Sequence, residues 1–154
     1  MTTQKALLIK VEDVPDIWIK VKPLVDSALE HSRNELNSYD ILKMILNEKG
    51  HLWIGVEDGD IKSALVTTII NYPRKRILRI VVWTVERESN SDIWLKYLYK
   101  IEDFARINEC SHLEAWARKG FTRKLGWNHD YTLISKLIKP KQQRKRRRRV
   151  NTNG

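Results

Sequence analysis

The sequence has a single cysteine, Cys110, and this scarcity limits how the chain can be stabilised. One cysteine excludes a disulfide within the chain and is typical of a protein from a reducing compartment. The four histidines, His31, His51, His112 and His129, lie far apart without the spacing of metal ligands. We therefore expect a domain that needs neither a disulfide nor a metal ion, with Cys110 as a small residue of the core.

Long apolar runs are also lacking. The apolar stretch before Lys10 covers only four residues, 6–9, which is too short for the core of a signal peptide and far too short to span a membrane. These absences predict a soluble cytoplasmic protein that makes no membrane contact.

Acidic residues are absent from the C-terminal end. The 154-residue chain has 29 Lys and Arg against 19 Asp and Glu, a net charge of +10. Residues 139–154 hold eight of the basic residues and no acidic one, so the rest of the chain carries only +2. This asymmetry divides the chain into a globular domain at residues 1–138, here termed the body, and a basic segment at residues 139–154, here termed the arm. A body of this length can bury one hydrophobic core.

The apolar periodicity of the body predicts alternating strands and helices. Strands are expected at 6–11, 51–57, 61–72, 77–85, 112–117 and 131–138. Helices are expected from residue 16 to about 29, and at 38–47, 94–110 and 119–125. Pro23 is a potential break or kink in the first helix, and Ser38 is a suitable cap for the second.

The turn residues indicate how these elements connect. Asp58-Gly59-Asp60 is typical of a hairpin, which makes 51–57 and 61–72 antiparallel neighbours. Residues 77–85 are apolar at odd and even positions alike, which suits a central strand that is covered on both faces. The predicted order is β-α-α-β-β-β-α-β-α-β.

This order resembles the GCN5-related N-acetyltransferase (GNAT) fold. The resemblance covers residues 5 to 138 and implies an α/β (α+β) architecture, a mixed, mostly antiparallel central sheet with helices on both faces. Residues 122–127, TRKLGW, are similar to the family's Y-x-K-L-G-F segment, and residues 101–106, IEDFAR, to its long third helix. Residues 117–123, ARKGFTR, are similar to an R-x-G-W-x-R phrase of small acyltransferase-like bacteriophage proteins. A bacteriophage protein of this kind would act in the host cytoplasm.

The resemblance implies a site for acetyl-coenzyme A. In the family this cofactor adds like an extra strand where the fourth strand splays from the fifth, and its pyrophosphate lies at the N-terminus of the next helix. The matching positions here are Thr84, Val85, Arg87, Asn90, Ser91 and Asp92. The family's [QR]-x-x-G-x-[GA] pattern keeps its arginine, but Asn90 and Asp92 replace the two small residues, and Asp92 brings a negative charge toward a negative ligand. Alternatively, Ser91 or Asp92 serves only as the N-cap of the following helix.

Acetyl transfer to an amine requires an unprotonated amine, donors to the thioester carbonyl and a proton source for the leaving thiolate. Glu86 at the end of the central strand and Glu114 on the neighbouring strand are the predicted bases. For each, a solvated charge or an ion-pair partner is the alternative. Thr122 occupies the position of the tyrosine acid that is common in the family, so Tyr131 is the predicted acid, with packing as its alternative.

The arm is expected to be disordered when free, because it cannot bury enough apolar area to offset its ordering entropy. Its basic residues would displace counterions from a nucleic acid and give salt-dependent, largely sequence-independent binding. These residues are Lys141, Arg144, Lys145, Arg146, Arg147, Arg148 and Arg149. RNA, DNA and acidic protein surfaces are all compatible partners, and a solubilising tail or an import signal is the alternative.

Two functions are compatible with these observations. The first is an acyltransferase that uses acetyl-coenzyme A to modify an amine on a macromolecular partner reached through the arm. The second is a GNAT-fold protein that has lost catalysis and serves as a binding or phage-assembly module, anchored to nucleic acid by the arm. The altered loop and the threonine at position 122 favour the second.

Overall fold

The computed structural model describes residues 3–30, 35–85, 93–115, 125–128 and 135–140. Within these ranges the chain forms, in order, β1 (Gln4–Leu8), the short 3-10 helix η1 (Val11–Asp13), α1 (Val14–Leu29), α2 (Ser38–Leu46), β2 (His51–Glu57), β3 (Asp60–Asn71), β4 (Arg76–Val85), α3 (Ile93–Ile107) and β5 (His112–Ala115). The predicted order is confirmed as far as β5.

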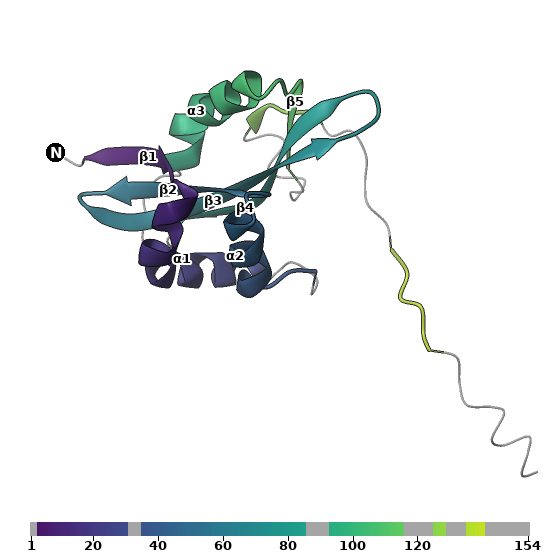
Figure 1. Ribbon diagram of the computed structural model, residues 1–154, viewed down its shortest axis with the longest axis horizontal. Coiled ribbons are helices and arrows are strands. Elements are labelled where there is room, and N and C mark those ends of the chain that lie inside the picture. The colour runs from purple at the N-terminus through teal and green to yellow at the C-terminus, as the bar shows by residue number, and fades with distance from the viewer. Residues whose placement is uncertain (1–2, 31–34, 86–92, 116–124, 129–134, 141–154) are drawn as a thin grey trace, which may run out of the picture.

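The five strands form one sheet in the order β1-β2-β3-β4-β5. The first three pairings are antiparallel, and β5 pairs with β4 in parallel. Figure 1 shows α1 and α2 on one face of the sheet and α3 on the other. The predicted fold class, a mixed and mostly antiparallel sheet with helices on both faces, is confirmed.

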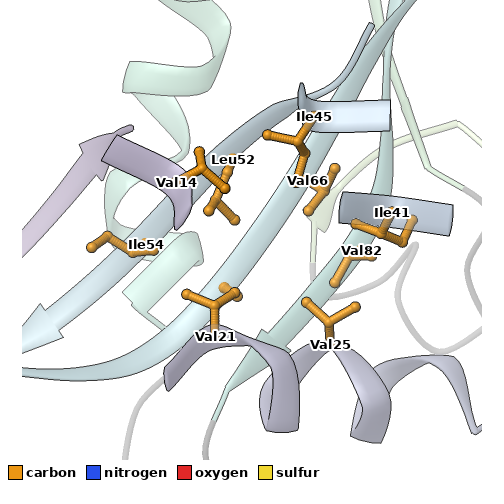
Figure 2. Close-up of a cluster of buried hydrophobic side chains, with 10 residues drawn as sticks. Val14, Val21, Val25, Ile41, Ile45, Leu52, Ile54, Val66 and Val82 are labelled. Carbon is orange, nitrogen blue, oxygen red and sulfur yellow. The ribbon is translucent and has the colours of Figure 1, made fainter. Parts of the chain in front are cut away.

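The face of the sheet toward α1 and α2 carries the first half of the core (Figure 2). Val21 and Val25 of α1 and Ile41 of α2 are fully buried. They pack with Val14, Ile45, Leu52, Ile54, Ala64, Val66 and Val82. Burying a side chain of this size contributes roughly 1.5–3 kcal/mol. The two helices are therefore held on the sheet mainly by aliphatic packing.

The opposite face carries the second half of the core, under α3. Trp94 and Ile101 of α3 are fully buried, and they cluster with Ala6, Trp53, Leu65, Leu78, Ile80, Ile93 and Ala105. Cys110 is partly buried at the edge of this cluster. Strands β2 to β4 thus contribute to both halves of the core, as expected of a sheet covered on both sides.

Two helix details differ from the sequence prediction. Pro23 lies inside α1, which continues through it from Val14 to Leu29. Pro23 and Ile19, four residues earlier, are both exposed, so the backbone carbonyl that loses its helical partner faces water. The cap of α2 is Asn37 rather than Ser38: Asn37 Oδ1 accepts from Asp40 N at 2.9 Å, and Asp40 Oδ2 accepts from Asn37 N at 3.0 Å.

Strand β1 lies at an edge of the sheet, and α3 covers its outer side. Tyr97 OH donates to the carbonyl of Gln4 at 3.3 Å, and Lys100 Nζ donates to the carbonyl of Ala6 at 3.0 Å. Helix α3 is kinked at Tyr97, which has φ −106° and ψ 17°. Two outward-facing carbonyls of the edge strand are therefore satisfied by side chains.

The predicted C-terminal elements fall partly outside the described residues. Residues 119–124 and 131–134 lie there, but Leu125 is helical and Gly126 has a φ of 70°, as expected of a glycine that ends a helix. Residues 135–138 are not in a strand and are exposed, so that half of the predicted last strand is wrong. Alternating apolar residues were misleading there because no described strand pairs with them. None of the described helices has the length and apolar character needed to cross a membrane.

Candidate functional site

Strand β4 contains an irregularity at Val81. Val66 of β3 is paired with Val82, but the next residue, Thr67, is paired with Ile80, so Val81 has no partner on β3. An extra residue of this kind bends a strand and increases its twist. The second half of β4 therefore takes a different direction from the first half.

The described pairing between β4 and β5 reaches the same point, where the described part of β5 also ends. Its last pair is Ile80 with Ala115, directly before the irregularity at Val81. Among the described residues, 81–85 of β4 pair only with β3.

The first turn of α3 is fixed at the end of β4. Ile93 and Trp94 are buried, with 1% and 0% of their surfaces exposed. Trp94 Nε1 donates to the carbonyl oxygen of Thr84 at 3.3 Å. This hydrogen bond and the packing around it join the helix N-terminus to the C-terminal end of β4.

Gly55 of β2 makes this close approach possible. A Cβ atom at position 55 would lie 2.9 Å from Ile93 Cγ2 and 2.9 Å from Ser63 Cβ. Contacts this short would push α3 away from the sheet. The absence of a side chain at Gly55 therefore allows the start of α3 to pack closely against β2.

The predicted cofactor residues begin where the strand and helix meet. Thr84 and Val85 form the end of β4, after the irregularity at Val81. Arg87, Asn90, Ser91 and Asp92 lie outside the described residues, as does the predicted base Glu86. In the sequence, these residues connect Val85, the last residue of β4, to Ile93, the first residue of α3.

Glu114 lies at the other end of β4. It is opposite Arg79 in the parallel pair, and its Oε2 is 3.3 Å from Arg79 Nη2, while its Oε1 is 3.9 Å from Lys75 Nζ. Arg79 is six positions before Val85, about 20 Å along an extended strand. The structure thus shows Glu114 in an ion pair and does not bring it near Thr84 and Val85.

Two further observations limit the site. Tyr131, the predicted acid, lies outside the described residues. In the part of the chain that the structure describes, no three His, Cys, Asp or Glu side chains are grouped so that they could hold a metal ion. Sequence reasoning did not identify the roles of Gly55 and Trp94, because each depends on contact with a distant segment.

No protein-family model matches the sequence, and no curated protein matches it significantly. The fold, however, is similar to that of solved acetyltransferases. An aminoglycoside acetyltransferase from an uncultured soil metagenomic sample is 14% identical with a TM-score of 0.68, covering 90% of this chain and 97% of that one. A ribosomal-protein-alanine N-acetyltransferase from Brucella melitensis is 12% identical with a TM-score of 0.67, over 89% and 100% of the two chains.

A GNAT family acetyltransferase from Staphylococcus aureus is 12% identical with a TM-score of 0.64, over 88% of this chain and 99% of that one. Identities this low establish similarity of fold alone. The chain therefore has the fold of GNAT-family acetyltransferases.

Proposed function

We propose that this protein is an acyltransferase that transfers an acyl group from acetyl-coenzyme A to an amine on a macromolecular partner. One observation carries the proposal: β4 is bent by the extra residue Val81, and the first turn of α3 is anchored at the end of the same strand. An extended ligand with an anionic end fits this arrangement, because the end of a strand and a helix N-terminus are brought together. The fold shared with acetyltransferases supports the same conclusion.

The residues at this junction suit the binding of such a cofactor. The backbone of Thr84 and Val85 would hold its extended part, and Arg87, Asn90 and Ser91 would lie near its phosphates. Acetyl-coenzyme A would supply an acyl group activated as a thioester. The chain's own task is to orient it and to move protons at the acceptor amine and at the leaving sulfur.

We assign these proton transfers to Glu86 and Tyr131. The carboxylate of Glu86 would accept the proton of the attacking amine, and the phenol oxygen of Tyr131 would donate a proton to the leaving thiolate. Glu114 is the weaker base because its carboxylate is already paired with Arg79 and Lys75, at the far end of β4. Glu86 is the residue that follows β4 in the sequence, and for this reason we assign the base to it.

A second candidate function is a binding or particle-assembly module without catalysis, such as a bacteriophage protein of this fold would provide. The sequence favours it at Asn90 and Asp92, which replace small residues in the phosphate-binding pattern, and at Thr122, which replaces a tyrosine. In both proposals the arm contacts a nucleic acid or another polyanion. The two proposals differ only in what the junction of β4 and α3 does.

Calorimetric titration with acetyl-coenzyme A distinguishes the two functions. We expect saturable heat with acetyl-coenzyme A and none with a nicotinamide dinucleotide, an anionic control of comparable size. Glu86→Gln should retain binding but slow the release of free thiol in the presence of an amine acceptor. If acetyl-coenzyme A gives no heat at high micromolar concentration, the acyltransferase is excluded and the binding module remains.

A further inference from the structure

The far end of the β3–β4 hairpin, residues 68–79, is here termed the hairpin tip. Strand β2 pairs with β3 only as far as Thr67, and β5 pairs with β4 only from Ile77 onward. Among the described strands, residues 68–71 of β3 therefore pair only with β4, and Arg76 of β4 pairs only with β3. Figure 1 shows this end of the hairpin extending past the helices, while Ile77 and Leu78 at its base are buried in the core.

The hairpin tip is strongly basic. Residues 61–85 contain five basic residues and no acidic one, and four of the five, Arg74, Lys75, Arg76 and Arg79, are in the tip. Among the described residues, the carboxylate that contacts the tip is that of Glu114 on β5, which pairs with Lys75 and Arg79. Even with Glu114 included, the tip carries a net charge of about +3, a concentration of charge that attracts polyanions.

Two of these arginines are already oriented by hydrogen bonds. Arg76 Nε donates to the carbonyl of Asn108 at 2.8 Å, and its Nη1 donates to Asn71 Oδ1 at 3.1 Å. Arg79 Nη2 donates to Tyr72 OH at 2.9 Å and to Glu114. Guanidinium groups held in this way lose less side-chain entropy when they bind a phosphate.

An aromatic ring lies among these charges. Tyr72 is 38% exposed, and Lys75 Nζ is 5.7 Å from the centre of its ring. Surfaces that bind single-stranded nucleic acids combine basic groups for the backbone with exposed aromatic rings on which bases stack. An acidic protein surface would form ion pairs with the basic side chains, but it would have no bases to stack on the ring of Tyr72.

We propose that the hairpin tip binds single-stranded nucleic acid, with Arg74, Lys75 and Arg76 at the phosphates and Tyr72 stacked on a base. This surface belongs to the body and does not involve the junction of β4 and α3. It is also distinct from the arm, so nucleic acid would contact the protein at two places. The proposal therefore stands or falls independently of acyl transfer.

The test is a double substitution in the full-length chain, Arg74→Gln with Lys75→Gln, which leaves the arm intact. Binding of fluorescent oligo-dT and oligo-U is followed by anisotropy over a range of KCl concentrations. Single strands give a slope of log K against log salt of about −0.7 per neutralised phosphate. We therefore expect the slope to become shallower by about 1.4 and the affinity at low salt to fall about tenfold.

The matched control is Lys20→Gln with Lys43→Gln, which removes the same charge from exposed positions on α1 and α2. An equal change of slope in both double variants would overturn the proposal, because net charge alone would explain it. Competition by polyglutamate as effective as that by oligonucleotide would also overturn it and would indicate an acidic protein partner.

Substitutions of Tyr72 test stacking separately from charge. Tyr72→Phe keeps the ring and should retain affinity, whereas Tyr72→Leu should weaken binding to both oligonucleotides without changing the salt slope. Circular dichroism melting of each variant verifies that the hairpin is folded. Equal affinities of the Phe and Leu variants would remove the stacking contact from the proposal, and a preference between oligo-U and oligo-dT would identify the nucleic acid.

Discussion

His51, at the start of β2, is the residue through which pH should act on the stability of the fold. Its Nδ1 lies 3.0 Å from Thr67 Oγ1, and its ring meets that of Phe104 edge-on with the centroids 4.8 Å apart. Trp53 Nε1 donates to the same threonine oxygen at 3.1 Å. Burial lowers the pKa of His51 below its ordinary value of about 6.5, and the contact with Thr67 opposes this shift only in part.

A lowered pKa makes the unfolded chain bind more protons than the folded chain at mildly acidic pH. The free energy of unfolding should thus be fully maintained above about pH 6.5 and should fall as the pH drops below that value. In urea unfolding series at several pH values, His51→Gln should flatten this dependence. His112→Gln, at an exposed position, is the control and should follow the wild type. If His51→Gln keeps the wild-type slope, the pH dependence has another origin.

At the residue scale, the sequence indicated which residues could act at the site but not which other residues they contact. It placed Thr84 and Val85 correctly at the end of a strand, because the apolar run 77–85 ends there. It could not show that Trp94 bonds to Thr84, nor that Glu114 faces Arg79, 35 residues earlier. Such pairs depend on strand register, which no local pattern specifies.

At the scale of elements, the junction of β4 and α3 is the part of the fold on which the proposed site depends. Trp94→Phe would keep most of the packing but leave the Thr84 carbonyl without its indole donor. We expect the free energy of unfolding to fall by about 1 kcal/mol and the affinity for acetyl-coenzyme A to fall as well. Urea unfolding and calorimetry measure the two effects.

Trp53→Phe is the matched control for this prediction. It also removes an indole hydrogen bond, the one from Trp53 to Thr67, on the same face of the sheet. It should lower stability to a similar extent without changing cofactor affinity. Equal losses of affinity in both variants would mean that the junction has no special role in binding.

The elements differ in how well the sequence predicted them. Strand β2 was predicted with its observed bounds, because Gly50 precedes it and Asp58-Gly59 turns the chain after it. The irregularity at Val81 was not predicted, since an extra valine among apolar residues leaves no visible break in the pattern. Residues 135–138 were predicted as strand and are not one, because alternation alone supplies no neighbouring strand.

At the scale of the whole molecule, the division into body and arm remains a prediction, since residues 141–154 lie outside the described ranges. Its test is the replacement of Arg146, Arg147, Arg148 and Arg149 by glutamine. At about 0.7 per phosphate contact, the salt slope for single-stranded nucleic acid should become shallower by about 2.8. Lys20→Gln with Lys43→Gln is again the control, and an unchanged slope in the arm variant would refute electrostatic binding by the arm.

The edge of the sheet at β1 is protected against the addition of another strand. The side chains of Tyr97 and Lys100 donate hydrogen bonds to its outward-facing carbonyls. Exposed strand edges are templates for aggregation, and a charged side chain over the edge is one way to block it. Replacing Lys100 would therefore endanger the solubility of the protein at high concentration before it affected any reaction, because a second molecule could then add its own β1 at this edge.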